Sequence, residues 1–164
     1  MRTLAIDLGG KRTGLALSDE TGKFVSPHGL IESADESQLL EAIAEACETE
    51  GVARVVVGCP LNMDGTAGKP ALSALRFGRV VRDRVGLPTL LVDERRSSIA
   101  ADAQLAERRR AGEKLTHKRK KQRRDALAAA AILQAFLDGD APGLDVSAAD
   151  AEARLKDGVL DASV

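Results

Sequence analysis

Short apolar runs alternate with amphipathic stretches along most of the chain. Five runs have the length and composition of strands: residues 3–7, 13–18, 24–31, 54–58 and 88–94. The first two flank a glycine-containing turn, which predicts a β-hairpin, and the third extends it into an antiparallel unit. Pro27 favours either an edge position for that third strand or a break in it. The last two runs are apolar on both faces, which is typical of buried parallel strands.

Between and after these strands, apolar residues recur with helical spacing. Helices are expected from Ser33 or Asp35 to about residue 50, and over residues 71–85, 99–110 and 124–138. Two or three antiparallel strands followed by alternating helices and strands predict an α/β fold. We therefore expect a mixed five-stranded sheet, with its first three strands antiparallel and helices on its faces.

The composition changes after residue 138. Residues 139–164 are acidic, rich in Ala and Gly, and sparse in large apolar side chains. Such a segment has little apolar surface with which to offset the entropy of ordering. We predict one folded domain over residues 1–138, followed by a mobile acidic tail over residues 139–164.

The composition narrows the function classes. The 164 residues include no Trp or Tyr and three Phe, so the core must be aliphatic and few rings can stack on bases. Cys47 and Cys59 form neither a disulfide framework nor a zinc motif. No apolar run is long enough for a signal peptide or a membrane span, so we expect a cytoplasmic protein with no membrane partner.

Four carboxylates stand at the ends of predicted elements. Asp7 ends the first strand, Asp93 and Glu94 end the strand at 88–94, and Asp125 opens the last helix. Each has a benign interpretation as a turn former or a helix-capping acid. Asp125, however, lies in the middle of the apolar face of its helix, where a carboxylate must be paired, protonated or bound to a metal.

These acids predict a metal site if the first and fifth strands are parallel neighbours, because the carboxyl ends of parallel strands share one edge of a sheet. Side chains alternate along a strand, so only one of Asp93 and Glu94 joins Asp7. Both faces of that strand look buried, so periodicity does not choose between them. Clustered carboxylates suit Mg²⁺ or Mn²⁺, and two such ions hydrolyse phosphodiesters.

Positive charge is concentrated just before Asp125. Residues 108–124 contain six Arg, four Lys and a single Glu. So dense a block is either a solvated helix face or linker, or a contact surface for a polyanion such as nucleic acid. The loop at residues 60–69, PLNMDGTAGK, does not match the P-loop pattern. It is either a turn before a helix or a loop that contacts substrate through its amides, Asn62 and Lys69.

Four blocks in order resemble one known family. IDLGGKRTGLALSD, VVVGCPLNMDGTAG, VDERRSS and RRDALAAAAILQAFL are similar to the YqgF/RuvX family, across about residues 3–138. The resemblance implies an RNase H-like, RuvC-like fold and a metal-dependent nuclease. Members are described as cytoplasmic nucleases that mature the 5′ end of 16S ribosomal RNA precursor, and resolution of four-way DNA junctions is also proposed.

By this resemblance, Asp7, Glu94 and Asp125 are the catalytic and metal-binding acids, and Mg²⁺ or Mn²⁺ is the cofactor, with two ions expected. The family pattern therefore selects Glu94 over Asp93. The predicted partners are structured RNA or branched DNA and a ribosomal particle, and the chain is either a monomer or a homodimer. The candidate substrate-binding residues are Lys11, Arg12, Asn62, Lys69, Arg95, Lys118, Arg119, Lys120, Lys121, Arg123 and Arg124.

Two other function classes stay open at this point. A non-catalytic RNA-binding factor for ribosome assembly would use the basic block without needing a metal. The DLGG turn also resembles the phosphate-binding hairpin of actin-like ATPases and sugar kinases, but those enzymes close two such domains on a nucleotide. Stabilisation by Mg²⁺ or Mn²⁺ that is lost in Asp7→Asn would separate a nuclease from a binding factor.

Overall fold

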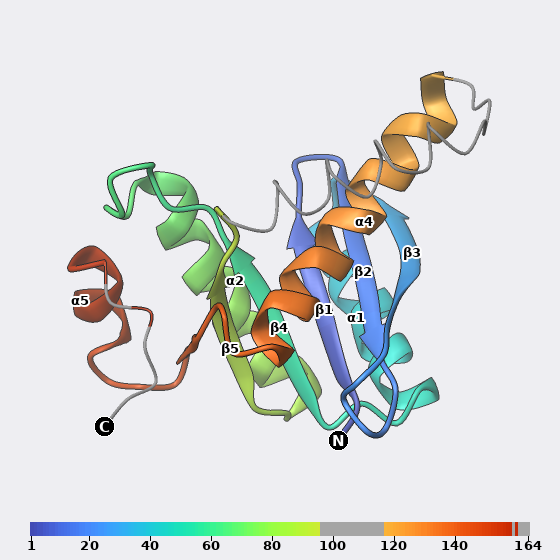
Figure 1. Cartoon of the computed structure of the whole chain (residues 1–164), viewed down its shortest axis with the longest axis horizontal. Helices are drawn as coiled ribbons and strands as arrows, with labels where there is room; N and C mark the ends of the chain where they lie inside the picture. The colour runs from blue at the N-terminus through green and yellow to red at the C-terminus, as the bar shows by residue number, and fades with distance from the viewer. Residues whose placement is uncertain (96–116, 159, 161–164) are drawn as a thin grey trace.

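The protein is built on one mixed sheet covered by helices on both faces (Figure 1). The computed structural model describes residues 1–95, 117–158 and 160, and for residues 117–123 it describes the main chain alone. The expected helix at 99–110 lies outside the described residues. The strand order is β3-β2-β1-β4-β5-β6. The strands are β1 (Thr3–Leu8), β2 (Arg12–Ser18), β3 (Val25–Glu32), β4 (Arg54–Cys59), β5 (Thr89–Asp93) and β6 (Gly143–Asp145).

The directions of the strands confirm the antiparallel start. β2 pairs antiparallel with both β1 and β3, and β3 is an edge strand that tolerates Pro27. β1 and β4 are parallel, as are β4 and β5. β4 therefore lies between β1 and β5. The first and fifth strands are thus not direct neighbours, although we had made this the condition for a metal site. Their carboxyl ends still lie along one edge of the sheet.

The helices form two layers. α1 (Glu36–Thr49) and α2 (Lys69–Val85) cover one face of the sheet, and α4 (His117–Leu137) crosses the other (Figure 1). Asp35 caps α1 by accepting hydrogen bonds from the main-chain N–H groups of Ser37 and Gln38. Gly86, at φ 70°, ends α2 in the left-handed conformation that glycine adopts at little cost.

α4 begins earlier than we predicted. It starts at His117, not near Arg124, because the Lys and Arg residues before Asp125 are good helix formers with no breaker among them. Asp125 therefore lies inside the helix and not in its first turn. The last eight residues of the basic block, 117–124, belong to this helix. Residues 108–116 of the block lie outside the described part of the chain.

Both faces of the sheet are buried by aliphatic side chains. Val55 and Val57 of β4 point to the α1–α2 side, whereas Val56 points to the α4 side, and all three are fully buried. This double burial explains why β4 and β5 read as continuous apolar runs. Phe77 is the sole fully buried aromatic residue among the described residues. No helix in the described part of the chain has both the length and the apolar character needed to cross a membrane.

The C-terminal segment corrects two of our expectations. Gly143–Asp145 forms β6, which pairs antiparallel with β5, so the sheet has six strands and not five. α5 (Ala151–Lys156) follows, and Leu144, Leu155 and Leu160 are buried. The expected mobile tail is therefore wrong for residues 139–158. The average composition of the segment did not reveal this order, because a few well-spaced apolar side chains and the free edge of β5 are enough to hold the segment.

Candidate active site

Asp7 and Glu94 lie at the carboxyl edge of the sheet, on the face covered by α4. The register sets this arrangement, because alternate residues of a strand share a face. Ala5 of β1 and Val92 of β5 belong to the α4-side core, and Asp7 and Glu94 follow them by two residues. Leu91 belongs to the opposite core, which directs Asp93 to the other face. The structure thus selects Glu94, the choice that periodicity left open.

Gly58 lies in β4, between β1 and β5, and makes room there for the Glu94 carboxylate. A Cβ atom at position 58 would lie 2.7 Å from Oε2 of Glu94 and 2.7 Å from Cδ1 of Ile132 in α4. A glycine inside a strand often marks a close approach of this kind. The side chain of Glu94 therefore lies over β4, in the direction of Asp7.

Asp125 reaches the same edge from α4. A Cβ atom on Gly14, the β2 partner of Asp7, would collide with the main-chain oxygen of Asp125, so the helix passes close to the hairpin here. The Asp125 side chain is half-buried, and its Oδ2 lies 3.8 Å from Nη1 of Arg12. Nε of Arg12 lies 3.8 Å from Glu32. Nη1 is buried and makes no hydrogen bond with any residue that the structure describes, so its contact with Asp125 is electrostatic.

The electrostatics connect the three acids through Asp7. Burial and, to a smaller extent, the charge of Asp125 raise the pKa of Asp7 from 3.8 to about 6. Burial, followed by the charges of Asp7 and Asp93, raises the pKa of Glu94 from 4.5 to about 7. Carboxylates that are desolvated and close to like charges resist ionisation, and a nearby cation would relieve this.

The ligand chemistry of these residues fits a hard divalent cation. Carboxylate oxygens are the ligands that Mg²⁺ and Mn²⁺ prefer, and Asp7 interacts electrostatically with both other acids. Among the described residues, no three His, Cys, Asp or Glu side chains are close enough together to form a complete metal cage. The structure therefore brings the three predicted acids to one edge of the sheet, with Asp7 between the other two.

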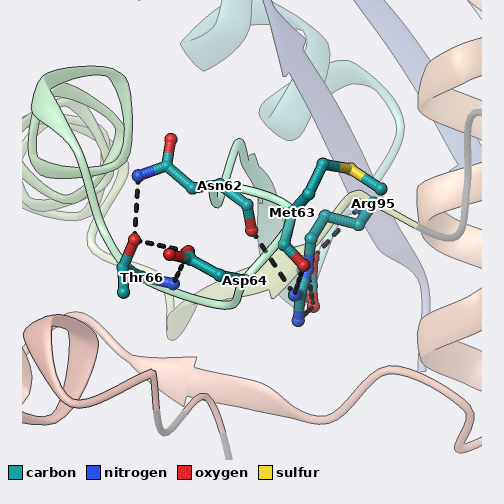
Figure 2. A network of polar contacts seen from close by, with 6 residues as sticks. Asn62, Met63, Asp64, Thr66 and Arg95 are labelled. Carbon is teal, nitrogen blue, oxygen red and sulfur yellow. Dashed lines mark hydrogen bonds and ion pairs between the residues drawn. The ribbon is translucent and has the colours of Figure 1, made fainter.

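Arg95 connects this edge to the loop between β4 and α2 (Figure 2). Its Nε donates to Oδ1 of Asp93 at 3.0 Å and its Nη2 to Oδ2 at 2.6 Å, a bidentate ion pair. Nη1 makes long 3.5 Å contacts with the main-chain oxygens of Asn62 and Met63. Asp93 is thus a positioning residue for Arg95, and Arg95 holds the loop beside Glu94.

The predicted substrate-binding residues are not all in one place. Lys11 is exposed on the β1–β2 turn, whereas Arg12 is half-buried and lies against Asp125. Asn62 and Lys69 are exposed in the loop and at the start of α2. Arg124 is exposed on α4. The side chains of Lys118, Arg119, Lys120, Lys121 and Arg123 lie outside the described residues.

Sequence reasoning missed three features of this site. It did not find the Arg12–Asp125 contact, the Asp93–Arg95 pair or the accommodating role of Gly58. Gly58 was detectable, because a glycine between Val57 and Cys59 interrupts an otherwise strong strand. The two ion pairs had no signal in the sequence, since acids and bases of this kind occur throughout the chain.

Comparisons with known proteins agree with the fold and the family resemblance. The RuvX family, described as "Holliday junction resolvase", matches residues 1–139. A "Putative pre-16S rRNA nuclease" of Syntrophomonas wolfei is 38% identical, over 88% of this chain and 99% of that protein. One of the same name from Anaeromyxobacter sp. (strain K) is 42% identical, over 87% of this chain and 100% of that protein.

The structural comparison supports the same fold. Thermus thermophilus RuvC, solved in complex with a Holliday junction substrate, has a TM-score of 0.56 and 18% identity, over 88% of this chain and 99% of RuvC. At this identity the likeness concerns the fold alone, which is RuvC-like. The family assignment comes from the match over residues 1–139 and from the two near-full-length relatives: the protein belongs to the RuvX family.

Proposed function

We propose that this chain is a metal-dependent nuclease that hydrolyses phosphodiester bonds, and that it processes the 5′ end of pre-16S rRNA in the cytoplasm. The observation that carries the proposal is the pair of desolvated carboxylates, Asp7 and Glu94, at the carboxyl edge of the sheet. Ligand sites of open α/β sheets occur at this edge. The names of the curated relatives favour ribosomal RNA as the substrate.

In this proposal Asp7, Glu94 and Asp125 hold Mg²⁺ or Mn²⁺, with two ions in the complete site. When bound, the ions would activate a water molecule and stabilise the oxygen that leaves the phosphorus. The chain itself supplies partly desolvated carboxylates at the edge of the sheet. Arg12 offsets the charge of Asp125 and is well placed to meet a phosphate that approaches the acids.

The surroundings of the acids offer phosphate contacts from several elements. Lys11 on the β1–β2 turn, Lys69 at the start of α2 and the basic residues of α4 up to Arg124 are the proposed contacts. Phosphate contacts of this kind set the position of a nucleic acid without reading its sequence. Asn62 and Arg95 belong to the loop side of the same edge. A ribosomal particle that carries the precursor is the proposed partner.

A second candidate function is resolution of four-way DNA junctions. The description of the matching family and the fold shared with RuvC favour it. Symmetrical cleavage of a junction needs two coordinated sites, and therefore a dimer with two-fold symmetry. The two candidates differ in substrate and in oligomeric state, so one set of experiments separates them.

The test is cleavage by the wild type, Asp7→Asn and the control variant Asp140→Asn, with Mg²⁺, with Mn²⁺ or with chelator. Asp140 is an exposed acid beyond the end of α4, so its loss should leave cleavage unchanged. The substrates are a 16S precursor 5′ leader, single-stranded RNA, single-stranded DNA and a four-way DNA junction. We expect metal-dependent cleavage of the leader by the wild type and the control, and none by Asp7→Asn.

Preferential cleavage of the junction by a dimer would replace rRNA processing with resolution. If no substrate is cut under any condition, while the wild type and Asp7→Asn bind the leader equally well, the nuclease proposal is wrong. That result would favour a non-catalytic RNA-binding role in ribosome assembly.

A further inference from the structure

The C-terminal segment, residues 139–160, lies almost entirely outside the part of the chain that the RuvX family shares. The family match ends at residue 139, and the two curated relatives are spanned almost completely by 87–88% of this chain. The segment nevertheless adds β6 to the sheet and places α5 near the loop between β4 and α2 (Figure 1). A fold that is complete without this segment raises the question of what the segment contributes.

The segment is firmly attached to the sheet and to α2. The N–H of Val146 donates to the main-chain oxygen of Thr89 at 3.2 Å, which continues the pairing of β6 with β5. Nε of Arg79 in α2 donates to the main-chain oxygen of Val146 at 3.0 Å. Ala151 and Leu155 of α5 are fully buried in the core on the α1–α2 side. These contacts give the end of α5 a fixed position relative to the sheet.

Beyond α5, the main chain touches the loop at residues 62–66. A Cβ atom on Gly158 would lie 2.9 Å from the main-chain oxygen of Gly65 and 3.6 Å from its carbonyl carbon. Both glycines have positive φ, at 73° and 86°, which is the region that glycine adopts without strain. The absence of a side chain at Gly158 therefore permits direct contact between the two main chains.

The loop is closed by its own hydrogen bonds and is held on its other side by Arg95. The N–H of Asn62 donates to the oxygen of Thr66 at 2.9 Å, and the N–H of Gly65 donates to the oxygen of Asn62 at 2.8 Å. Arg95, fixed by Asp93, contacts the main-chain oxygens of Asn62 and Met63 (Figure 2). The loop thus lies between Arg95 and Gly158, and it presents Met63 with 90% of its surface exposed.

We propose that residues 139–160 form a positioning element that holds the 62–66 loop against Arg95, and so fixes the loop side of the nucleic-acid surface proposed above at the carboxyl edge of the sheet. This inference rests on the proposed nuclease function. A loop that is ordered before binding loses less conformational freedom when it contacts a ligand, so the bracing strengthens binding of nucleic acid. The bracing does not alter the carboxylates, so its loss should raise KM and leave kcat unchanged.

The chain offers a matched pair of glycines for the test. Gly139 also has positive φ, at 80°, but a Cβ atom there would meet nothing within 4 Å. Gly158→Ala and Gly139→Ala therefore carry the same kind of backbone strain, and only Gly158→Ala pushes on the loop. Asn tolerates positive φ better than Ala, so Gly158→Asn and Gly139→Asn provide a second pair if the Ala variants fold poorly.

Loop order can be measured without any activity. The chain contains no Trp or Tyr, so Met63→Trp places a single tryptophan at an exposed position of the loop. We would measure the fluorescence anisotropy of this residue in the full chain, with each glycine variant added. Separately, in chains that keep Met63, we would measure the Kd for a fluorescent 16S precursor leader in chelator, and KM and kcat with Mn²⁺.

We expect lower tryptophan anisotropy in the Gly158 variants than in the Gly139 variants, and RNA binding weakened by about tenfold in the Gly158 variants alone. Equal anisotropy in the two sets would overturn the bracing, whether or not the protein cuts RNA. Lower anisotropy with unchanged Kd and KM would overturn the link to nucleic acid. If the wild type binds no RNA, the proposed function fails, and with it the link between the loop and nucleic acid. The anisotropy still tests the bracing of the loop separately, because it is measured without RNA.

Discussion

Asp7→Asn should stabilise the metal-free protein at pH 8. Burial and the charge of Asp125 raise the pKa of Asp7 from 3.8 to about 6 in the folded protein. A carboxyl group whose folded pKa is raised contributes stability below its unfolded pKa, and this contribution is lost as the pH rises through the folded pKa. Ionised Asp7 therefore weakens the folded state above about pH 6, and Asn, which carries no charge, avoids the penalty.

The magnitude follows from the difference in pKa. A difference of about two corresponds to about 3 kcal/mol, at 1.36 kcal/mol for each step of one in pKa. The buried Asn amide still needs hydrogen-bond partners, so we expect a net gain of about 1–2 kcal/mol in the free energy of unfolding. For a chain of this length, that gain raises the Tm by roughly 2–8 °C. At pH 4 the folded carboxyl binds the proton and the unfolded one, with a pKa of 3.8, is about half protonated, so most of the advantage should vanish.

Thermal unfolding at pH 4, 6 and 8 in chelator, followed by circular dichroism, tests this. Asp140→Asn is the control and should follow the wild type at every pH, because Asp140 is exposed. With Mg²⁺ or Mn²⁺ at 100 times its Kd, the wild type should gain about 2.7 kcal/mol and the variant less. The reasoning is refuted if Asp7→Asn is no more stable than the wild type at pH 8, or if its advantage is the same at pH 4.

Three further substitutions test the rest of the site and the fold. Gly58→Ala should lower the free energy of unfolding by about 1–3 kcal/mol and displace Glu94, which denaturant unfolding and the pH dependence of metal binding can measure. Arg95→Lys removes the bidentate pair with Asp93 and should weaken RNA binding while the Tm changes little, because Arg95 is a half-exposed surface residue. Leu144→Ala should cost about 2–5 kcal/mol in urea unfolding, whereas a cost below 0.5 kcal/mol would mean that β6 is not part of the core.

The sequence predicted the sheet well where apolar runs and turns are strong. The antiparallel start, both buried strands and the edge position of Pro27 agree with the structure. It could not choose between Asp93 and Glu94, because both faces of β5 are buried and periodicity carries no information there. The choice became clear only from register, with Val92 facing α4 and Leu91 facing the other layer.

The C-terminal segment shows a different kind of failure. Its average composition is that of a mobile tail, but order depends on where the apolar side chains fall and on whether an open strand edge is available. Leu144 and Val146 fall on buried positions beside β5, and Leu155 reaches the core from α5. A free strand edge belongs to the folded domain, so no property of the segment alone could have revealed it.

The features that form the candidate site lower the stability of the fold around it. Gly14 and Gly58 lie inside strands, where glycine is a poor choice for stability, and both are needed because α4 and Glu94 come too close for any side chain. Asp7 and Glu94 are held where their ionised forms are disfavoured, although neither is needed to bury an apolar surface. Selection for stability alone would remove all four features. Their presence together at one edge of the sheet is explained if that edge binds a divalent cation, because the cation requires carboxylate ligands, and the cation in turn binds a phosphodiester.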